Sequence, residues 1–257
     1  MKKLLTASIL VIGTVYSAYA ADLGPAYKAP PPPPPPPPSW TGCYVDGGAG
    51  YGLWNIDHFA ETSALVPLTT TSTSGGRGWF GIVGGGCDYQ FSPGSGWGNW
   101  VVGAFADYEF MDLHRNLQET TASGEAKESS AWGVGGRIGY LVTPNVLTYW
   151  DGGYTQTRFD QINFSFDSAP FAPAGSVPAH TYNGWFIGGG TEISLSGLFG
   201  LPLPPGLFLR SEYRYSSFNS ADLQGSGPSG AGFALNTKPF VQTIWTALVY
   251  RFGWVGH

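Results

Sequence analysis

The chain has 257 residues, of which 11% are charged and 16% are aromatic, and it contains 39 glycines. Soluble domains usually carry roughly a quarter charged residues, so this composition is unusual for a protein that faces water on all sides. The formal charge is −5 and the few basic residues do not cluster, which argues against a nucleic-acid partner.

Residues 1–20 have the pattern of a secretory signal peptide. Two lysines precede an apolar run from Leu4 to Val15, and a small-x-small sequence ends at Ala20. Cleavage is therefore expected between Ala20 and Ala21. A membrane anchor is the alternative, but a helical span needs about 20 apolar residues and this run is shorter. We expect the mature protein to be exported.

Residues 21–39 form a Pro-rich segment that contains nine consecutive prolines, Pro30–Pro38. Such a run favours polyproline II and excludes a helix or a central strand. At about 3.1 Å per residue it would span roughly 28 Å. We interpret it as a periplasmic linker; a peptide docked by a periplasmic or cell-wall partner is the alternative. The next domain is predicted to cover residues 40–257.

From Trp40 onward, eight runs alternate between two residue classes and are rich in aromatic and β-branched residues, which is the strand signal. They cover residues 40–54, 78–91, 99–110, 131–142, 145–155, 184–195, 206–215 and 241–252. The connections 55–77, 111–130, 160–181 and 217–237 are long and polar, whereas those between them are short and rich in turn formers. The pattern predicts an all-β fold, an eight-stranded antiparallel up-and-down transmembrane barrel with long extracellular loops.

Charged residues of the strands share one parity, which should face the barrel interior. They are Asp46, Asp88, Asp107, Glu109, Arg137, Asp151, Glu192, Arg210, Glu212, Arg214 and Arg251. The opposite parity is almost free of charge. A soluble barrel would show the same alternation turned inside out, but its outer face would need more charges. Aromatics near the ends of the uncharged face also fit interfacial girdles, which favours lipid outside.

The stretch AADL, the opening WTGCYVDGGAGYG, the sixth run GW…GGG.E and the closing VYRF together resemble the small outer-membrane β-barrel proteins of α-proteobacteria, the surface antigens or porin-family proteins of opacity type. The resemblance covers the mature chain except the proline tract. It implies a monomeric or weakly oligomeric barrel in the outer membrane, in contact with lipid and lipopolysaccharide. It also implies that Leu248, Tyr250 and Phe252 form a C-terminal signal for the assembly machinery. The five residues after Phe252 depart from this pattern, and Trp254 is a competing aromatic end.

An eight-stranded barrel has an interior that side chains can fill. We interpret the interior charges as a closing ion network in which arginines pair with carboxylates. A narrow porin-like channel for small solutes, or a catalytic carboxylate pair, is the alternative.

Cys43 and Cys87 lie at mirrored positions around the first long connection, so a disulfide across the first two strands is expected in the oxidising periplasm. Two free, lipid-shielded thiols are the alternative.

Three histidines, His58, His114 and His180, fall in three different long connections. A surface metal or haem site could be built from them, but solvated side chains are the simpler interpretation, and no cofactor is predicted. No histidine has a serine at a motif-like spacing, so no enzyme is predicted. The sequence favours a structural, surface-exposed outer-membrane protein over a channel or a loop-borne receptor for haem, metal or a host surface.

Overall fold

The computed structural model describes residues 39–94, 97–118, 122–196, 203–227 and 232–252. The predicted signal peptide, its cleavage site at Ala20–Ala21, the proline tract and Trp254 lie outside these residues. Within them, no helix is long and apolar enough to cross a membrane. The described chain is built from the strands β1 (Gly42–Thr62), β2 (Ser72–Phe91), β3 (Trp100–Gln118), β4 (Ala122–Thr143), β5 (Val146–Phe159), β6 (Ile162–Phe166), β7 (Pro173–Val177), β8 (His180–Ser194), β9 (Leu207–Phe218), β10 (Ala221–Ser226) and β11 (Gly232–Arg251).

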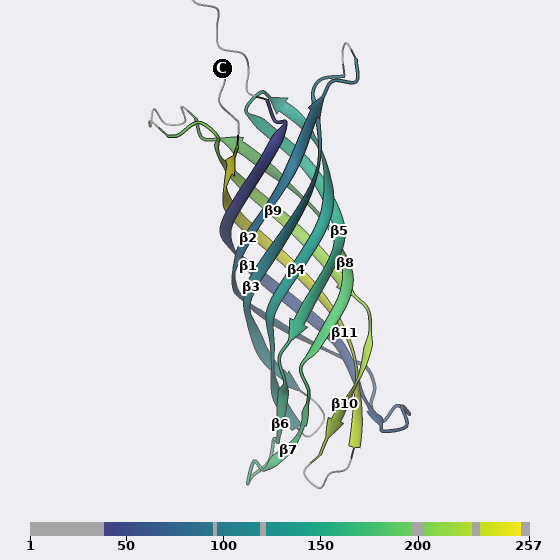
Figure 1. The fold of residues 1–257 in the computed structure, drawn as a ribbon. Coiled ribbons are helices and arrows are strands. Elements are labelled where there is room, and N and C mark those ends of the chain that lie inside the picture. The colour runs from purple at the N-terminus through teal and green to yellow at the C-terminus, as the bar shows by residue number, and fades with distance from the viewer. Residues whose placement is uncertain (1–38, 95–96, 119–121, 197–202, 228–231, 253–257) are drawn as a thin grey trace, which may run out of the picture. The chain divides into compact units, whose positions relative to one another are not determined.

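The sheet closes into a barrel because β1 pairs antiparallel with both β2 and β11. The ring runs β1-β2-β3-β4-β5-β8-β9-β11 and returns to β1. Neighbours in sequence are neighbours in space once the short strands are set aside, so the fold is the predicted eight-stranded up-and-down barrel. Figure 1 shows the tilt of the strands that such closure requires.

Three of the eight barrel strands are interrupted, each by two residues. The interruptions are Asp160–Gln161 between β5 and β6, Pro178–Ala179 between β7 and β8, and Asn219–Ser220 between β9 and β10. Beyond the breaks, β6 pairs with β4 and β10 pairs with β11, while β7 joins β6 to β10. The barrel thus continues past the breaks, with β6, β7 and β10 together at one end (Figure 1). We call this the distal end, and the end where β1 begins and β11 finishes the terminal end.

The prediction of four long polar loops is wrong. Strands cover most of 55–77, 111–130, 160–181 and 217–237, and the exposed turns shrink to short stretches such as residues 63–71 and 167–172. Outside a membrane the outer face of a barrel meets water, so polar residues are suitable there. In β3 and β4 the inward face stays apolar through Met111, Leu113, Leu117 and Ala126. The Ser/Thr-rich composition concealed this alternation.

The middle part of the barrel presents an uncharged outer surface. Val83, Ile138, Ile187 and Leu248 are each about half exposed on it. Two rows of exposed aromatics border this surface: Trp79, Phe110, Trp132, Tyr154 and Trp185 on the distal side, and Tyr89, Tyr140, Tyr250 and Phe252 on the terminal side. Along β4 the rows are separated by the stretch from Trp132 to Tyr140. An uncharged band between two aromatic girdles is the outer surface that a transmembrane barrel needs.

The interior is filled in three layers. At the terminal end lies an apolar cluster that contains Trp40, Leu147, Phe208 and Val249. At the distal end a larger cluster runs from Trp245 and Phe80 to Phe164 and Leu223. The eleven charged residues predicted for the interior lie between them. Apolar layers on both sides exclude water from the charges and strengthen their mutual attraction.

Inward-facing glycines leave the space that the side chains of the charged layer occupy. A Cβ atom added to Gly103 on β3 would collide with the carboxylate of Asp88 on β2, and one added to Gly188 would collide with that of Asp151. Gly84 lies in the same way beside Asp46, with its hypothetical Cβ 3.0 Å from the carboxylate. Each carboxylate therefore folds over a glycine of a neighbouring strand, which is why strands this rich in glycine still build a packed interior.

Candidate functional site: a charged belt inside the barrel

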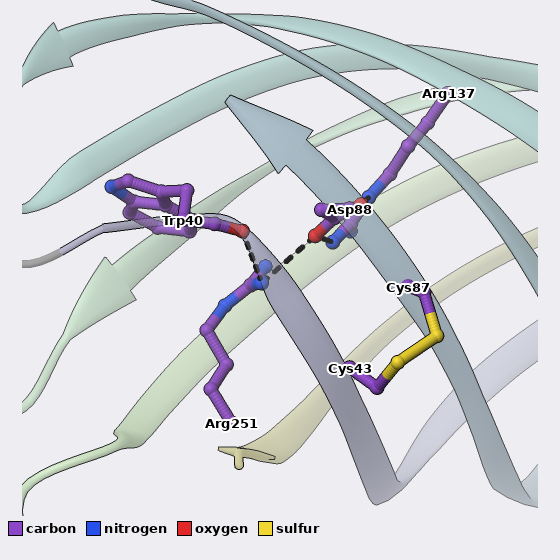
Figure 2. The surroundings of a disulfide bond; sticks show 6 residues. All are labelled: Trp40, Cys43, Cys87, Asp88, Arg137 and Arg251. Carbon is purple, nitrogen blue, oxygen red and sulfur yellow. Dashed lines mark hydrogen bonds and ion pairs between the residues drawn. A yellow bond between two sulfur atoms is a disulfide. The ribbon is translucent and has the colours of Figure 1, made fainter. Parts of the chain in front are cut away.

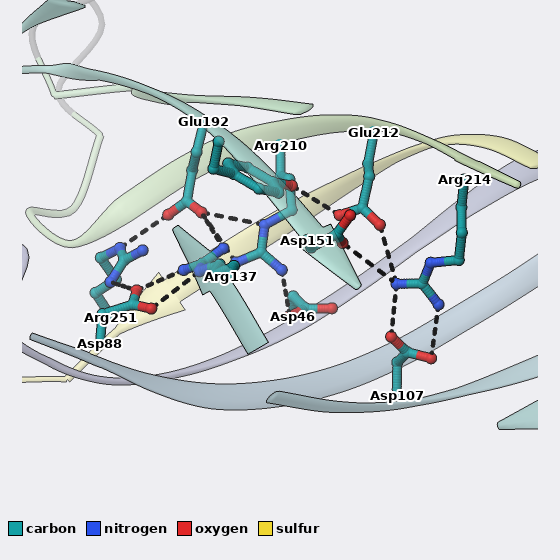
Figure 3. A network of polar contacts seen from close by, with 11 residues as sticks. Asp46, Asp88, Asp107, Arg137, Asp151, Glu192, Arg210, Glu212, Arg214 and Arg251 are labelled. Carbon is teal, nitrogen blue, oxygen red and sulfur yellow. Dashed lines mark hydrogen bonds and ion pairs between the residues drawn. The ribbon is translucent and has the colours of Figure 1, made fainter. Parts of the chain in front are cut away.

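The interior charges form two clusters along the barrel. The first, the three-arginine cluster, lies toward the terminal end and contains Asp46, Asp88, Glu192, Arg137, Arg210 and Arg251 (Figure 3). The second, the Arg214 cluster, lies distal to it and contains Asp107, Glu109, Asp151, Glu212 and Arg214. The structure thus brings together all eleven charged residues that the alternation assigned to the interior.

Glu192 on β8 is the centre of the three-arginine cluster. Its Oε2 accepts from Arg210 Nη2 at 2.9 Å, and its Oε1 accepts from Arg251 Nε at 2.8 Å. Arg137 Nη1 lies 3.4 Å from Oε2. Since all four side chains are at most 4% exposed, these are desolvated charge-assisted contacts, which are stronger than surface ion pairs.

Asp88 on β2, across the barrel from Glu192, is linked to Glu192 through shared arginines. Arg137 binds it with two donors, of which Nε lies 2.9 Å from Oδ1. Arg251 Nη1 lies 2.8 Å from Oδ2. Arg210 reaches Asp46 on β1 in the same way, with Nη1 3.0 Å from Oδ2. The cluster therefore links strands that are not neighbours in the sheet, and it holds three arginines against three carboxylates.

The three arginines also make cation–π contacts with aromatic rings. The guanidinium carbons of Arg137 and Arg210 each lie 4.6 Å from the centre of the Tyr44 ring, and that of Arg251 lies 4.6 Å from the Trp40 ring. A ring face attracts a desolvated cation, so the aromatics stabilise the charges as well as fill space.

Arg214 alone serves the second cluster. It donates to both oxygens of Asp107 at 3.1 and 2.8 Å, and to Glu212 Oε1 at 2.9 Å. Asp151 lies 3.9 Å from its Nη2 and Glu109 lies 3.5 Å from its Nη1. Four carboxylates thus surround one arginine, and the balance of charge seen in the first cluster is not repeated.

The belt leaves little free space. Two cavities border the Arg214 cluster, one lined by Arg137, Asp107 and Trp245 and the other by Glu109, Glu128 and Val241, and each has a volume of about 10 Å³. About 10–15 Å³ by this measure admits a single water molecule. Solutes would therefore need rearrangement of the belt to pass.

Cys43 and Cys87 are joined by a disulfide that lies on the outer surface of the barrel (Figure 2). The two residues face each other in the register of β1 and β2. The bond crosses between the same two strands that carry Asp46 and Asp88 on their inner faces. It fixes the register of the pair whose carboxylates bind the arginines.

The last strand separates lipid-facing from interior side chains as the alternation implied. Leu248, Tyr250 and Phe252 are about half exposed, whereas Arg251 between them is 3% exposed and turned inward. Arg251 Nη1 also donates to the carbonyl oxygen of Trp40 at 3.4 Å, and so joins the last strand to the first described residues.

The structure places the three histidines in different surroundings. His58 is fully buried on β1, which corrects its interpretation as a solvated loop residue. His114 is exposed beside Asp112, and His180 packs edge-on against Tyr182, where partial burial lowers the pKa of its ring. Among the described residues no group of three His, Cys, Asp or Glu side chains is placed to hold a metal.

Glu128 is an interior carboxylate that the sequence analysis missed. Glu128 on β4 is fully buried distal to the girdle residue Trp132, and Thr157 Oγ1 donates to its Oε1 at 2.6 Å. Burial raises the pKa of Glu128 to about 7, although the hydrogen bond from Thr157 acts in the opposite direction. The sequence analysis placed residues 111–130 in a loop and so did not consider Glu128. The β-bulge between Glu128 and Ser130 also shifts the inward parity, so alternation extended from the strand core would have placed this residue outside.

Comparison with known proteins gives a family match over most of the chain: the family described as "Outer membrane protein beta-barrel domain" matches residues 32–252. No curated protein matches the sequence. Among solved structures, OprG from Pseudomonas aeruginosa is similar at 12% identity and a TM-score of 0.49, covering 82% of this chain and 97% of that one.

Two further solved structures are similar over comparable lengths. The Neisserial surface protein A has 11% identity and a TM-score of 0.39, with 82% and 98% of the two chains covered. The attachment invasion locus protein of Yersinia pestis has 12% identity and a TM-score of 0.34, with 79% and 99% covered.

Proposed function

Because this chain belongs to the outer-membrane protein β-barrel family, we propose that it is a non-conducting surface protein of the outer membrane. Its distal end would face the cell exterior and present the short turns there. Within the family we assign it to the small α-proteobacterial proteins of opacity type, on the motifs of its first, sixth and last strands.

The observation that carries this proposal is the filled interior. Apolar side chains close both ends of the transmembrane part, and ion pairs bind across its middle. An ion entering from the terminal end would meet Trp40 and Phe208, and then guanidinium groups already paired with carboxylates. Opening a path requires breaking several buried ion pairs, each of which is costly to break.

Conductance in planar lipid bilayers tests the proposal. Protein refolded from inclusion bodies should give no more current in concentrated potassium chloride than a mock preparation from cells lacking the gene. Heat-modifiable migration on gels would show that the inserted protein is folded. Regular single-channel current steps from folded protein would refute the closed-lumen proposal and favour the narrow porin-like channel.

We further propose that the protein is not an enzyme, since its interior acids are used in structural pairs with arginines. Its expected partners are membrane lipid, lipopolysaccharide and, during biogenesis, the assembly machinery that recognises Leu248, Tyr250 and Phe252. The proline tract is proposed to lie in the periplasm. Protease added to intact cells should therefore cut at residues 63–71 or 167–172 and leave the tract intact. Cleavage within Pro30–Pro38 in intact cells would show that the proposed orientation in the membrane is wrong.

A further inference from the structure

The outer wall of the barrel carries a groove of about 400 Å³ on β5, β8 and β9. Trp150, Ile187 and Tyr213 form its sides, and Gly189 forms part of its floor. These side chains point outward, and they lie between the two rows of exposed aromatics that border the uncharged band. The groove therefore opens toward the hydrocarbon of the membrane, where an acyl chain is the neighbour available to fill it.

The groove depends on the missing side chain of Gly189. A Cβ atom added there would lie 3.2 Å from Cε3 of Trp150, so the indole ring extends beside the bare backbone of β8. Trp150 itself is 69% exposed, and Ile187 and Tyr213 are each about half exposed. Large side chains on both sides of a glycine leave a trough between them, and a flexible hydrocarbon chain can approach the backbone closely there.

Aromatic contacts lead from the groove to a positive charge. Tyr215 lines the distal part of the groove, and its ring stacks on that of Phe240 on β11 with 6.5 Å between the ring centres. Lys238 Nζ lies 5.2 Å from the centre of the Phe240 ring. The groove and the lysine are therefore joined by a continuous row of side chains on the outer surface.

The distance between the lysine and the groove suits one lipid. Along β11, Lys238 is six residues distal to Ile244, which is the partner of Tyr213 in β9. Six residues span about 20 Å, or about 15 Å along the membrane normal once the strand tilt is included. This is half of the hydrocarbon thickness of about 30 Å, so Lys238 lies at the depth of a headgroup whose acyl chain enters the groove.

The charge of Lys238 is available to a ligand. The residue is exposed, and it makes no ion pair with any residue that the structure describes. Asp57 lies opposite it in the β1–β11 pairing, but Asp57 Oδ1 accepts a hydrogen bond from Thr73 Oγ1 at 2.6 Å. A basic residue at this depth attracts the phosphate of an anionic lipid. Charge and groove together favour a lipid with both a phosphate and an acyl chain.

We propose that Lys238 and the groove together bind one molecule of lipid A, the phosphorylated glycolipid that anchors lipopolysaccharide, with a phosphate on Lys238 and an acyl chain in the groove. The choice of lipid A rests on the proposed function, because Lys238 is in the outer leaflet when the distal end faces the cell exterior. Phosphatidylglycerol offers the same two groups from the inner leaflet, so the lipids recovered from cells distinguish the two sources.

Native mass spectrometry of the delipidated full protein in detergent, titrated with lipid A, tests the binding. We expect a saturable one-to-one complex. Lys238→Gln should weaken it about fivefold, since one lysine near an anionic lipid contributes that much. Lys127→Gln on β4 should leave it unchanged, because Lys127 is already paired with Asp112 at 2.7 Å. Asp57→Asn removes the acid opposite Lys238 and should strengthen binding.

A second pair of variants tests the groove. Thr191→Trp places an indole in the groove and should weaken lipid A binding at least as much as Lys238→Gln does. Thr246→Trp on β11 is also lipid-facing but lies outside the groove, and it should have no effect. Heat-modifiable migration shows that each variant is folded, and the exposed Lys238→Gln keeps the test valid where Thr191→Trp folds poorly. No one-to-one complex, or equal losses in the test and control variants, would overturn the proposal.

Lipids that co-purify from outer membranes in mild detergent identify the source. One lipid A per wild-type protein is expected, and less with Lys238→Gln. Phosphatidylglycerol in its place would overturn the assignment to lipid A, and proteolysis of intact cells would then show whether the orientation is wrong as well. Absence of both lipids would overturn this inference alone, since the closed lumen and the orientation are measured separately by conductance and proteolysis.

Discussion

Arg137 offers the sharpest test of the charged belt, because its removal unbalances the three-arginine cluster without emptying it. The substitution Arg137→Met keeps most of the side-chain volume and deletes the charge and three charge-assisted hydrogen bonds, two to Asp88 and one to Glu192. Such bonds contribute about 1.5–3 kcal/mol each. Breaking a buried pair costs about 3–5 kcal/mol overall.

The expected cost lies near the lower limit of that range, because both carboxylates keep other arginines. Asp88 retains Arg251 at 2.8 Å, and Glu192 retains Arg210 and Arg251. The free energy of unfolding should therefore fall by about 3 kcal/mol. Urea unfolding in lipid vesicles, followed by tryptophan fluorescence, measures it. The exposed Arg158→Met serves as the matched control and should change stability by less than about 0.5 kcal/mol.

A double-mutant cycle separates electrostatics from packing. Adding Asp88→Asn to Arg137→Met restores the balance at two arginines against two carboxylates, so at least about 1.5 kcal/mol of the combined single losses should be recovered. If the two losses simply add within about 0.5 kcal/mol, the pair is not coupled and the belt is a hydrated interior instead of a closed network.

Three further outcomes follow from the structure. Gly103→Ala should destabilise the barrel by about 1–3 kcal/mol because its Cβ would collide with Asp88 and lie 2.9 Å from the carbonyl oxygen of Cys87, whereas lipid-facing Gly47→Ala, with nothing closer than 3.9 Å, should be neutral in the same unfolding assay. Thiol labelling of unreduced, denatured protein should find no free cysteine, and replacing Cys43 and Cys87 by serine should lower stability by about 2–4 kcal/mol; two labelled thiols would contradict the bond. Burial raises the folded-state pKa of Glu128 to about 7 from an ordinary value of 4.5, so the stability that its protonated form contributes is fully present below pH about 4.5 and is lost as the pH rises through about 7. Glu128→Gln should therefore be more stable than wild type at pH 8 by about 3 kcal/mol and equal to it at pH 4, and a stability difference that does not depend on pH would show that Glu128 is not desolvated.

The transmembrane part of the fold could be predicted from the sequence because lipid leaves a strong signature. Charges at one parity and Val83, Ile138 or Leu248 at the other admit few folds besides a barrel with lipid outside. The distal strands gave no such signature, since water touches their outer face and small polar residues are suitable there. Hence the sequence pattern places Met111, Leu117 and Phe164 in loops, although these residues continue the core.

The partners inside the belt could not be predicted in the same way. Arg137 on β4 meets Asp88 on β2 across an intervening strand, so their contact depends on the stagger of the sheet and on the space left by Gly103. Alternation gives the direction of a side chain but not its height in the barrel. Because the heights are unknown from the sequence, the unequal distribution of arginines between the two clusters could not be predicted either. Arg214 alone is surrounded by four carboxylates.

The distal strands and the transmembrane barrel share one apolar core, and this affects how the surface can vary. The core cluster that contains Phe80 and Trp245 within the membrane band also contains Phe164, Val177 and Leu223 of the short distal strands. A substitution at Phe164 or Leu223 therefore removes packing from the barrel itself, at a cost typical of core truncation. Substitutions in the turns at residues 63–71 or 167–172 remove exposed side chains and leave that core intact. Variation in the exposed surface should thus be confined to the turns, while the strands that carry them stay fixed by the same contacts that close the lumen.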